Sequence, residues 1–131
     1  MKILTLIARI LLGLTFFVFG LNGFFYFMPP PPTGVPQAAM DFSLAMMKTG
    51  YFSQLVAGTQ VACGFLLLVG RFVPLALTVL APVIVNIVLF HVFLYPSAIV
   101  IPLVVVALEL YLAWVYRAAF KPMLAARAAT R

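Results

Sequence analysis

The stretch Phe72–Tyr95, "FVPLALTVLAPVIVNIVLFHVFLY", has 24 residues and contains no aspartate, glutamate, lysine or arginine. A helix needs roughly 20 largely apolar residues to cross the hydrocarbon core of a bilayer. Three more apolar stretches approach this length, at about residues 4–27, 51–69 and 101–120. The sequence therefore predicts an all-α integral membrane protein, an antiparallel bundle of four transmembrane helices in a single domain over residues 1–131.

The composition excludes the soluble classes of protein. Of the 131 residues, 66% are hydrophobic and 8% are charged, whereas soluble domains are about half apolar and a quarter charged. The formal net charge is +6. Nucleic-acid binding needs a clustered basic face, but these basic residues stand at the ends of the apolar stretches, so no nucleic-acid partner is expected.

Residues 37–48, "QAAMDFSLAMMK", are too few and too polar to span. At 100° per residue, Gln37, Asp41 and Lys48 share one narrow wedge of a helix, and apolar side chains cover most of the rest. This pattern predicts a short amphipathic helix that lies in the membrane interface between spans one and two. Four consecutive prolines in "MPPPPTGVP", Met28–Pro36, end span one because proline lacks a backbone donor.

The basic residues also predict the orientation. Membrane proteins keep an excess of lysine and arginine in their cytoplasmic loops. With four spans and the N-terminus inside, only Lys48 falls outside; the inner residues are Lys2, Arg71, Arg117, Lys121, Arg127 and Arg131. Both termini are therefore expected in the cytoplasm. Aromatic residues near the span ends are expected to be interface anchors, namely Tyr51, Tyr95, Trp114 and Tyr116.

Polar residues inside the spans are the candidates for a functional site. At about 1.5 Å of rise per residue, Gln60, Asn86 and Glu109 lie at one depth near the bilayer centre. Asn22 and His91 form a second layer, closer to the outer surface.

Glu109, in "VVVALELYLAW", is the costliest of these residues. A charge at mid-membrane costs about 3 kcal/mol on insertion scales, so the carboxyl group should face the bundle interior. We expect it to bond Gln60 or Asn86, and less readily Arg9, which lies nearer the inner surface. Replacing it with leucine would then strand an amide and cost about 1–3 kcal/mol.

Each of these residues also has a structural interpretation. Gln60 and Asn86 can be interhelical hydrogen-bond partners, and His91 can be a satisfied structural residue. Arg9 is first a positive-inside residue and second a charge partner for a carboxylate or an anionic ligand. Cys63 is the one cysteine, so an internal disulfide is excluded and a buried structural thiol is expected.

The sequence contains no catalytic constellation and no metal-ligand spacing. The single histidine excludes a bis-histidine haem within one chain. We therefore expect no catalytic residues, no metal site and no intrinsic cofactor, and contact with a quinone, a lipid or a pigment stays open. Small residues predict close packing instead: Gly13 and Gly20 in span one should face Ala57 or Gly64 in span two.

Four segments carry a resemblance to a known family. They are "ARILLGLTFFVFGLNGFF", "GTQVACGFLLLVGRFVPLAL", "APVIVNIVLFHVFLYP" and "LELYLAWVYRAAFKPML". In order and spacing they resemble the DoxX family of small four-span bacterial membrane proteins. The resemblance implies a bacterial inner-membrane location and a link to membrane redox chemistry, since DoxD-type relatives form a subunit of a thiosulfate–quinone oxidoreductase. Family members often carry a glutamate where this chain has Gln60.

Three functions follow from these observations. The first is a non-catalytic accessory subunit of a respiratory, photosynthetic or quinone-linked electron-transfer complex, with membrane lipid and other membrane subunits as partners. The second is a protein that binds a quinone or another lipophilic compound at a polar site inside the bundle. The third is a small transporter.

Overall fold

The structure, a computed structural model, describes residues 2–29 and 34–130, and its regular secondary structure over these ranges is entirely helical. The elements are α1 (Lys2–Phe25), α2 (Gln37–Lys48), α3 (Phe52–Val69), α4 (Val73–Leu94), η1 (Pro96–Ala98), α5 (Val100–Val115), α6 (Arg117–Phe120) and η2 (Pro122–Leu124).

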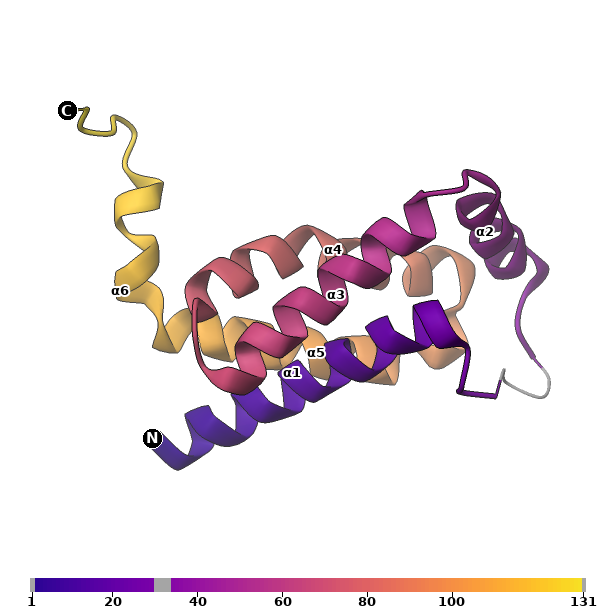
Figure 1. Ribbon diagram of the computed structural model, residues 1–131, viewed down its shortest axis with the longest axis horizontal. Coiled ribbons are helices and arrows are strands. Elements are labelled where there is room, and N and C mark those ends of the chain that lie inside the picture. Colours follow the sequence, from indigo (N-terminus) through magenta and orange to yellow (C-terminus); the bar gives the residue numbers. More distant parts are fainter. Residues whose placement is uncertain (1, 30–33, 131) are drawn as a thin grey trace.

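Four helices form the body of the molecule (Figure 1). Helices α1 and α4 each contact both α3 and α5. The start of α1, the α3–α4 connection and α6 lie at one end of this body, and α2 and η1 lie at the other end. Helix α2 contacts α3 and α4 there.

Helices α1, α3 and α4 are each long and apolar enough to cross a membrane. Helix α5 qualifies as a fourth span only together with the segment Arg117–Leu124, from which it is bent by 77°. Large apolar side chains stay exposed on the outer faces of the helices, as at Phe65 and Leu110. The prediction of an all-α membrane protein is confirmed, and the four-span bundle and the interfacial position of α2 stay predictions.

The helix bounds agree with the predicted ones to within two residues, except at the end of the fourth stretch. That helix was expected to continue to Phe120, but it ends at Val115, and Tyr116 leaves helical geometry with φ −93° and ψ 16°. Arg117 Nη1 donates to the Trp114 carbonyl oxygen at 2.8 Å. The guanidinium also lies 4.7 Å from the centre of the Trp114 ring. This arginine therefore covers the end of α5 and favours its termination there.

Helix α1 ends at Phe25, two residues before the predicted end at Phe27. The backbone turns at Tyr26, whose φ is 52°. The predicted stop at the proline run rests on Pro30–Pro32, which lie outside the described residues.

The close contact predicted between α1 and α3 is confirmed. A Cβ atom added at Gly20 would lie 2.8 Å from the Val61 nitrogen and 2.9 Å from the Ala57 oxygen. One added at Gly64 would lie 2.8 Å from the Gly13 oxygen. Because backbone atoms occupy these places, only glycine lets the two helices approach so closely. Cys63 is buried beside this contact, as expected for a structural thiol.

Candidate functional site

Two of the predicted site residues, Gln60 on α3 and His91 on α4, line one cavity of about 670 Å³, here called the Gln60–His91 cavity. Both side chains are half-buried. The remaining lining is mostly apolar and comes from α1, α2, α4, η1 and α5: Thr15, Phe16, Phe19, Ser43, Ile87, Phe90, Tyr95, Ala98, Ile101, Pro102 and Val105. Nearly every element of the body thus contributes to this cavity, at the end where α2 lies.

The imidazole of His91 is held in a defined orientation. Its Nδ1 lies 2.8 Å from the Ile87 carbonyl oxygen. Since a carbonyl oxygen only accepts, Nδ1 carries a proton and donates it. In the neutral ring Nε2 is then an acceptor. The ring stacks on Tyr95 at a centroid distance of 6.1 Å, and these two contacts fix its orientation.

The Glu109 side chain is buried, with an exposed fraction of 9%. Its Oε1 is buried and has no hydrogen-bond partner among the described residues. No hydrogen bond in residues 2–29 and 34–130 joins it to Gln60, Asn86 or Arg9, so the predicted partnership is wrong. Glu109 instead lines two open grooves beside α4, of about 480 and 600 Å³, that also share Ala81 and Ala113.

Asn86 does not belong to an interior polar layer. Its side chain is exposed on the outer surface of α4, so the prediction that it shares a layer with Gln60 and Glu109 is wrong. The rise per residue gives a depth along the helix, but it does not specify which way a side chain faces. Helix α4 is apolar on all sides and offers no polar stripe to fix its rotation.

Asn22 has a local structural function. Its Oδ1 accepts a hydrogen bond from the Met28 backbone nitrogen at 2.8 Å. Its backbone oxygen accepts another from the Tyr26 nitrogen at 2.9 Å. The residue therefore fixes the chain as it leaves α1. It was expected to line the same site as His91, but it does not line the Gln60–His91 cavity.

Arg9 lies far from that cavity, at the other end of the molecule. It lines a separate cavity of about 440 Å³ with Lys2 and Tyr116. Its side chain is half-buried.

The sequence reasoning missed three polar residues of the Gln60–His91 cavity: Thr15, Ser43 and Tyr95. Tyr95 was interpreted as an interface anchor only. Ser43 could have been found, because it lies on the opposite side of α2 from the wedge of Gln37, Asp41 and Lys48. Over the described ranges, no three His, Cys, Asp or Glu side chains come together to hold a metal ion.

Comparison with protein families gives one match: the DoxX family model matches residues 4–92. Comparisons with curated proteins and with solved structures give no significant match. The matched segment covers more than half of the chain and includes α2, α3 and nearly all of α1 and α4. The chain therefore belongs to the DoxX family.

Proposed function

We propose that this protein binds a quinone-like lipophilic molecule in the Gln60–His91 cavity and is a non-catalytic accessory subunit of a bacterial membrane electron-transfer complex. The observation that carries the proposal is the cavity itself. Its volume of about 670 Å³ falls within the roughly 300–1,000 Å³ of small-molecule sites. Such sites are mostly apolar with a few fixed polar groups, and this lining fits that description.

The two central polar groups suit both states of a quinone. The side-chain amide of Gln60 can donate to a quinone carbonyl oxygen. His91 Nε2, an acceptor because Nδ1 donates to Ile87, can take a hydrogen bond from a quinol hydroxyl. The apolar residues around them, such as Phe16 and Phe90, would contact the ring and the tail.

The subunit role rests on a different observation. The Oε1 atom of Glu109 is buried without a partner among the described residues, and it lies beside a groove that opens between α4 and α5. A buried acceptor without a donor costs about 1–3 kcal/mol. A helix of a neighbouring subunit that brings a donor into this groove would remove that cost.

The same proposal places the protein in the inner membrane of a bacterial cell, with four spans. Helix α2 then lies at the outer interface of this membrane, and both termini lie in the cytoplasm. This arrangement is supported by the distribution of charge. Lys2, Arg71 and Arg117 lie at the end of the body that holds the start of α1, and Lys48 closes α2 at the opposite end.

Ligand binding is tested by thermal unfolding of the purified protein in detergent, with decyl-ubiquinone or its quinol added. We expect both compounds to raise the unfolding temperature. Gln60→Leu and His91→Phe should each weaken binding about tenfold, which corresponds to about 1.4 kcal/mol. Asn86→Leu is the matched control, since that residue is exposed and lines neither the cavity nor the grooves; it should leave binding unchanged. If neither compound stabilises the protein, the proposed ligand is wrong.

The subunit role is tested separately, by purification of the tagged protein from its native membrane in digitonin. We expect it to elute with a larger assembly that contains redox subunits. Recovery only as a monomer or homo-oligomer would contradict the subunit role and leave the ligand test unaffected.

A further inference from the structure

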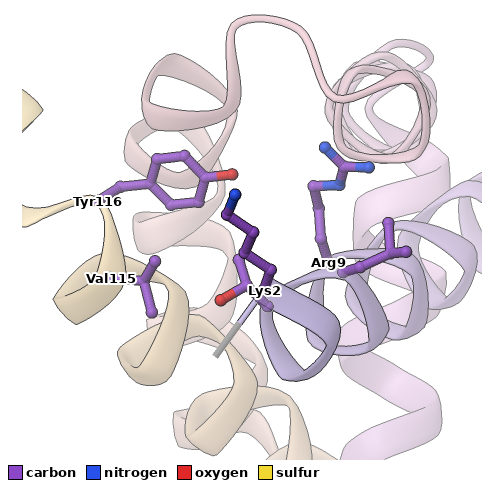
Figure 2. Close-up of a pocket in the computed structure, with 6 residues that line it drawn as sticks. Lys2, Arg9, Val115 and Tyr116 are labelled. Atoms are coloured by element: carbon purple, nitrogen blue, oxygen red, sulfur yellow. The ribbon is translucent and has the colours of Figure 1, made fainter.

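A second cavity lies at the opposite end of the molecule from the Gln60–His91 cavity. It measures about 440 Å³ and is lined by six residues of α1 and the end of α5: Lys2, Thr5, Leu6, Arg9, Val115 and Tyr116. In Figure 2 the Lys2 ammonium and the Tyr116 hydroxyl point toward one another across it, and the Arg9 side chain rises from the same helix as Lys2. We call it the Lys2–Arg9 cavity.

The two cations of this cavity share one face of α1, because seven residues make nearly two helical turns. Neither Lys2 nor Arg9 forms an ion pair with a carboxylate of the described chain. Asp41 is on α2 at the far end of the body, where its Oδ1 accepts from Gln37 at 2.8 Å. The buried Oε1 of Glu109 has no hydrogen-bond partner in the part of the chain that the structure describes. Two positively charged side chains therefore line one cavity without a counter-charge from the described residues.

Arg9 carries a further unsatisfied group. Its Nε is buried and has no hydrogen-bond partner among the described residues. A Cβ atom at Gly70 would collide with Arg9 Nη1, so the guanidinium rests against the bare backbone at the end of α3. Snorkelling toward water explains the position of an exposed lysine such as Lys2. It does not explain the position of a half-buried arginine that packs against the α3–α4 connection.

The chemistry of the lining selects the ligand. Lysine and arginine only donate hydrogen bonds, so the missing group must be an acceptor, and an anion suits two cations best. A guanidinium, an ammonium and the hydroxyls of Thr5 and Tyr116 are the donors that bind phosphate oxygens. Basic pockets between membrane helices bind acidic lipid headgroups in this way.

The apolar surroundings favour a lipid over a free anion. Leu6 and Val115 line the cavity itself. Leu6 is 49% exposed. An anion that carries acyl chains can cover these side chains, and inorganic phosphate cannot.

We propose that the Lys2–Arg9 cavity is a binding site for the phosphate group of an anionic phospholipid. Arg9 and Lys2 bind the phosphate oxygens, the Tyr116 hydroxyl donates a further hydrogen bond, and the acyl chains lie along Leu6 and Val115. The site is independent of the proposed quinone cavity, which lies at the other end of the body.

The test is native mass spectrometry of the full-length protein in detergent, with phosphatidylglycerol, phosphatidylcholine or inorganic phosphate added. We expect phosphatidylglycerol to bind at least tenfold more tightly than phosphatidylcholine. Lys2→Gln and Arg9→Gln should each weaken its binding about tenfold. Arg9→Lys should recover part of the loss, because it keeps the charge and loses the two-pronged guanidinium. Tyr116→Phe should weaken binding several-fold.

Arg127→Gln is the matched control, since it removes an exposed cation near the same end that does not line the cavity. It should leave binding unchanged, and a loss equal to that of Lys2→Gln would show diffuse attraction and overturn the proposal. Equal binding of the two lipids would overturn it as well. If inorganic phosphate binds as tightly as phosphatidylglycerol, the occupant is a soluble phosphate and the lipid assignment is wrong. If Arg9→Gln does not fold, the binding of phosphatidylglycerol to Lys2→Gln and Tyr116→Phe tests the proposal instead.

Discussion

At the scale of single residues, the structure reverses the effect on stability that is expected from replacing Glu109. With an amide partner, its replacement by leucine would be costly, but the described contacts supply no partner for Oε1. Removing a buried acceptor that makes no hydrogen bond also removes its desolvation cost. We therefore predict that Glu109→Leu leaves the free energy of unfolding of the isolated protein unchanged or raises it by about 1 kcal/mol. Thermal unfolding in detergent, followed by circular dichroism, measures this change.

Leu112→Ala is the control for the sensitivity of that measurement. Leu112 lies on the same helix with an exposed fraction of 0%, and truncating such a leucine costs about 2–5 kcal/mol. If Glu109→Leu instead lowers stability by 1–3 kcal/mol while the control behaves as expected, the carboxyl group has an intramolecular partner. The argument for a donor from another subunit would then be lost.

At the scale of elements, the α1–α3 contact makes a sharp prediction about two glycines. A methyl group at Gly20 would lie 2.8 Å from the Val61 nitrogen, and a backbone atom cannot yield without moving a helix. Gly20→Ala should therefore lower the free energy of unfolding by about 1–3 kcal/mol through overpacking. Urea or thermal unfolding in detergent provides the measurement.

Gly58→Ala is the matched substitution in α3. Its added methyl group would find only Phe24 Cζ, at an ordinary contact distance of 3.8 Å. Because alanine is a better helix former by about 1 kcal/mol, this variant should be neutral or slightly more stable. Helix propensity favours alanine at both positions, so equal destabilisation of both variants would mean that the loss at Gly20 does not come from the α1–α3 contact.

At the scale of the whole molecule, the sequence predicted what depends on spacing along a helix. Three long helices begin and end within two residues of the expected positions, and Gly13 and Gly20 face Gly64 and Ala57. The candidate site was predicted less well, because it depends on rotation about each helix axis. In spans that are apolar all round, no stripe distinguishes an inward residue from an outward one, so Asn86 was placed inside and lies outside. Asn22 was assigned to the site wrongly for another reason: its side chain already accepts a hydrogen bond from the backbone of Met28.

The number of spans determines on which side of the membrane the end of the chain lies. With four spans, Lys48 and Arg127 lie on opposite sides of the membrane. If α5 and the segment after it fail to cross as one span, Arg127 follows only three crossings and lies on the same side as Lys48. Both residues are exposed, and Cys63, the one native cysteine, is buried and replaceable by alanine.

We predict that a membrane-impermeant maleimide labels Lys48→Cys in intact spheroplasts of cells that carry the Cys63→Ala background. Arg127→Cys and Arg71→Cys should react only after permeabilisation. The physical reason is the charge asymmetry, since positively charged loops resist translocation. The start of α1, the α3–α4 connection and α6, which carry Lys2, Arg71 and Arg117, lie at the end of the body away from α2. Labelling of Lys48→Cys and Arg127→Cys from the same side would give an odd number of spans. Labelling of Arg71→Cys and Arg127→Cys, but not Lys48→Cys, in intact spheroplasts would keep four spans and invert them. That result would also place the Lys2–Arg9 cavity in the outer leaflet.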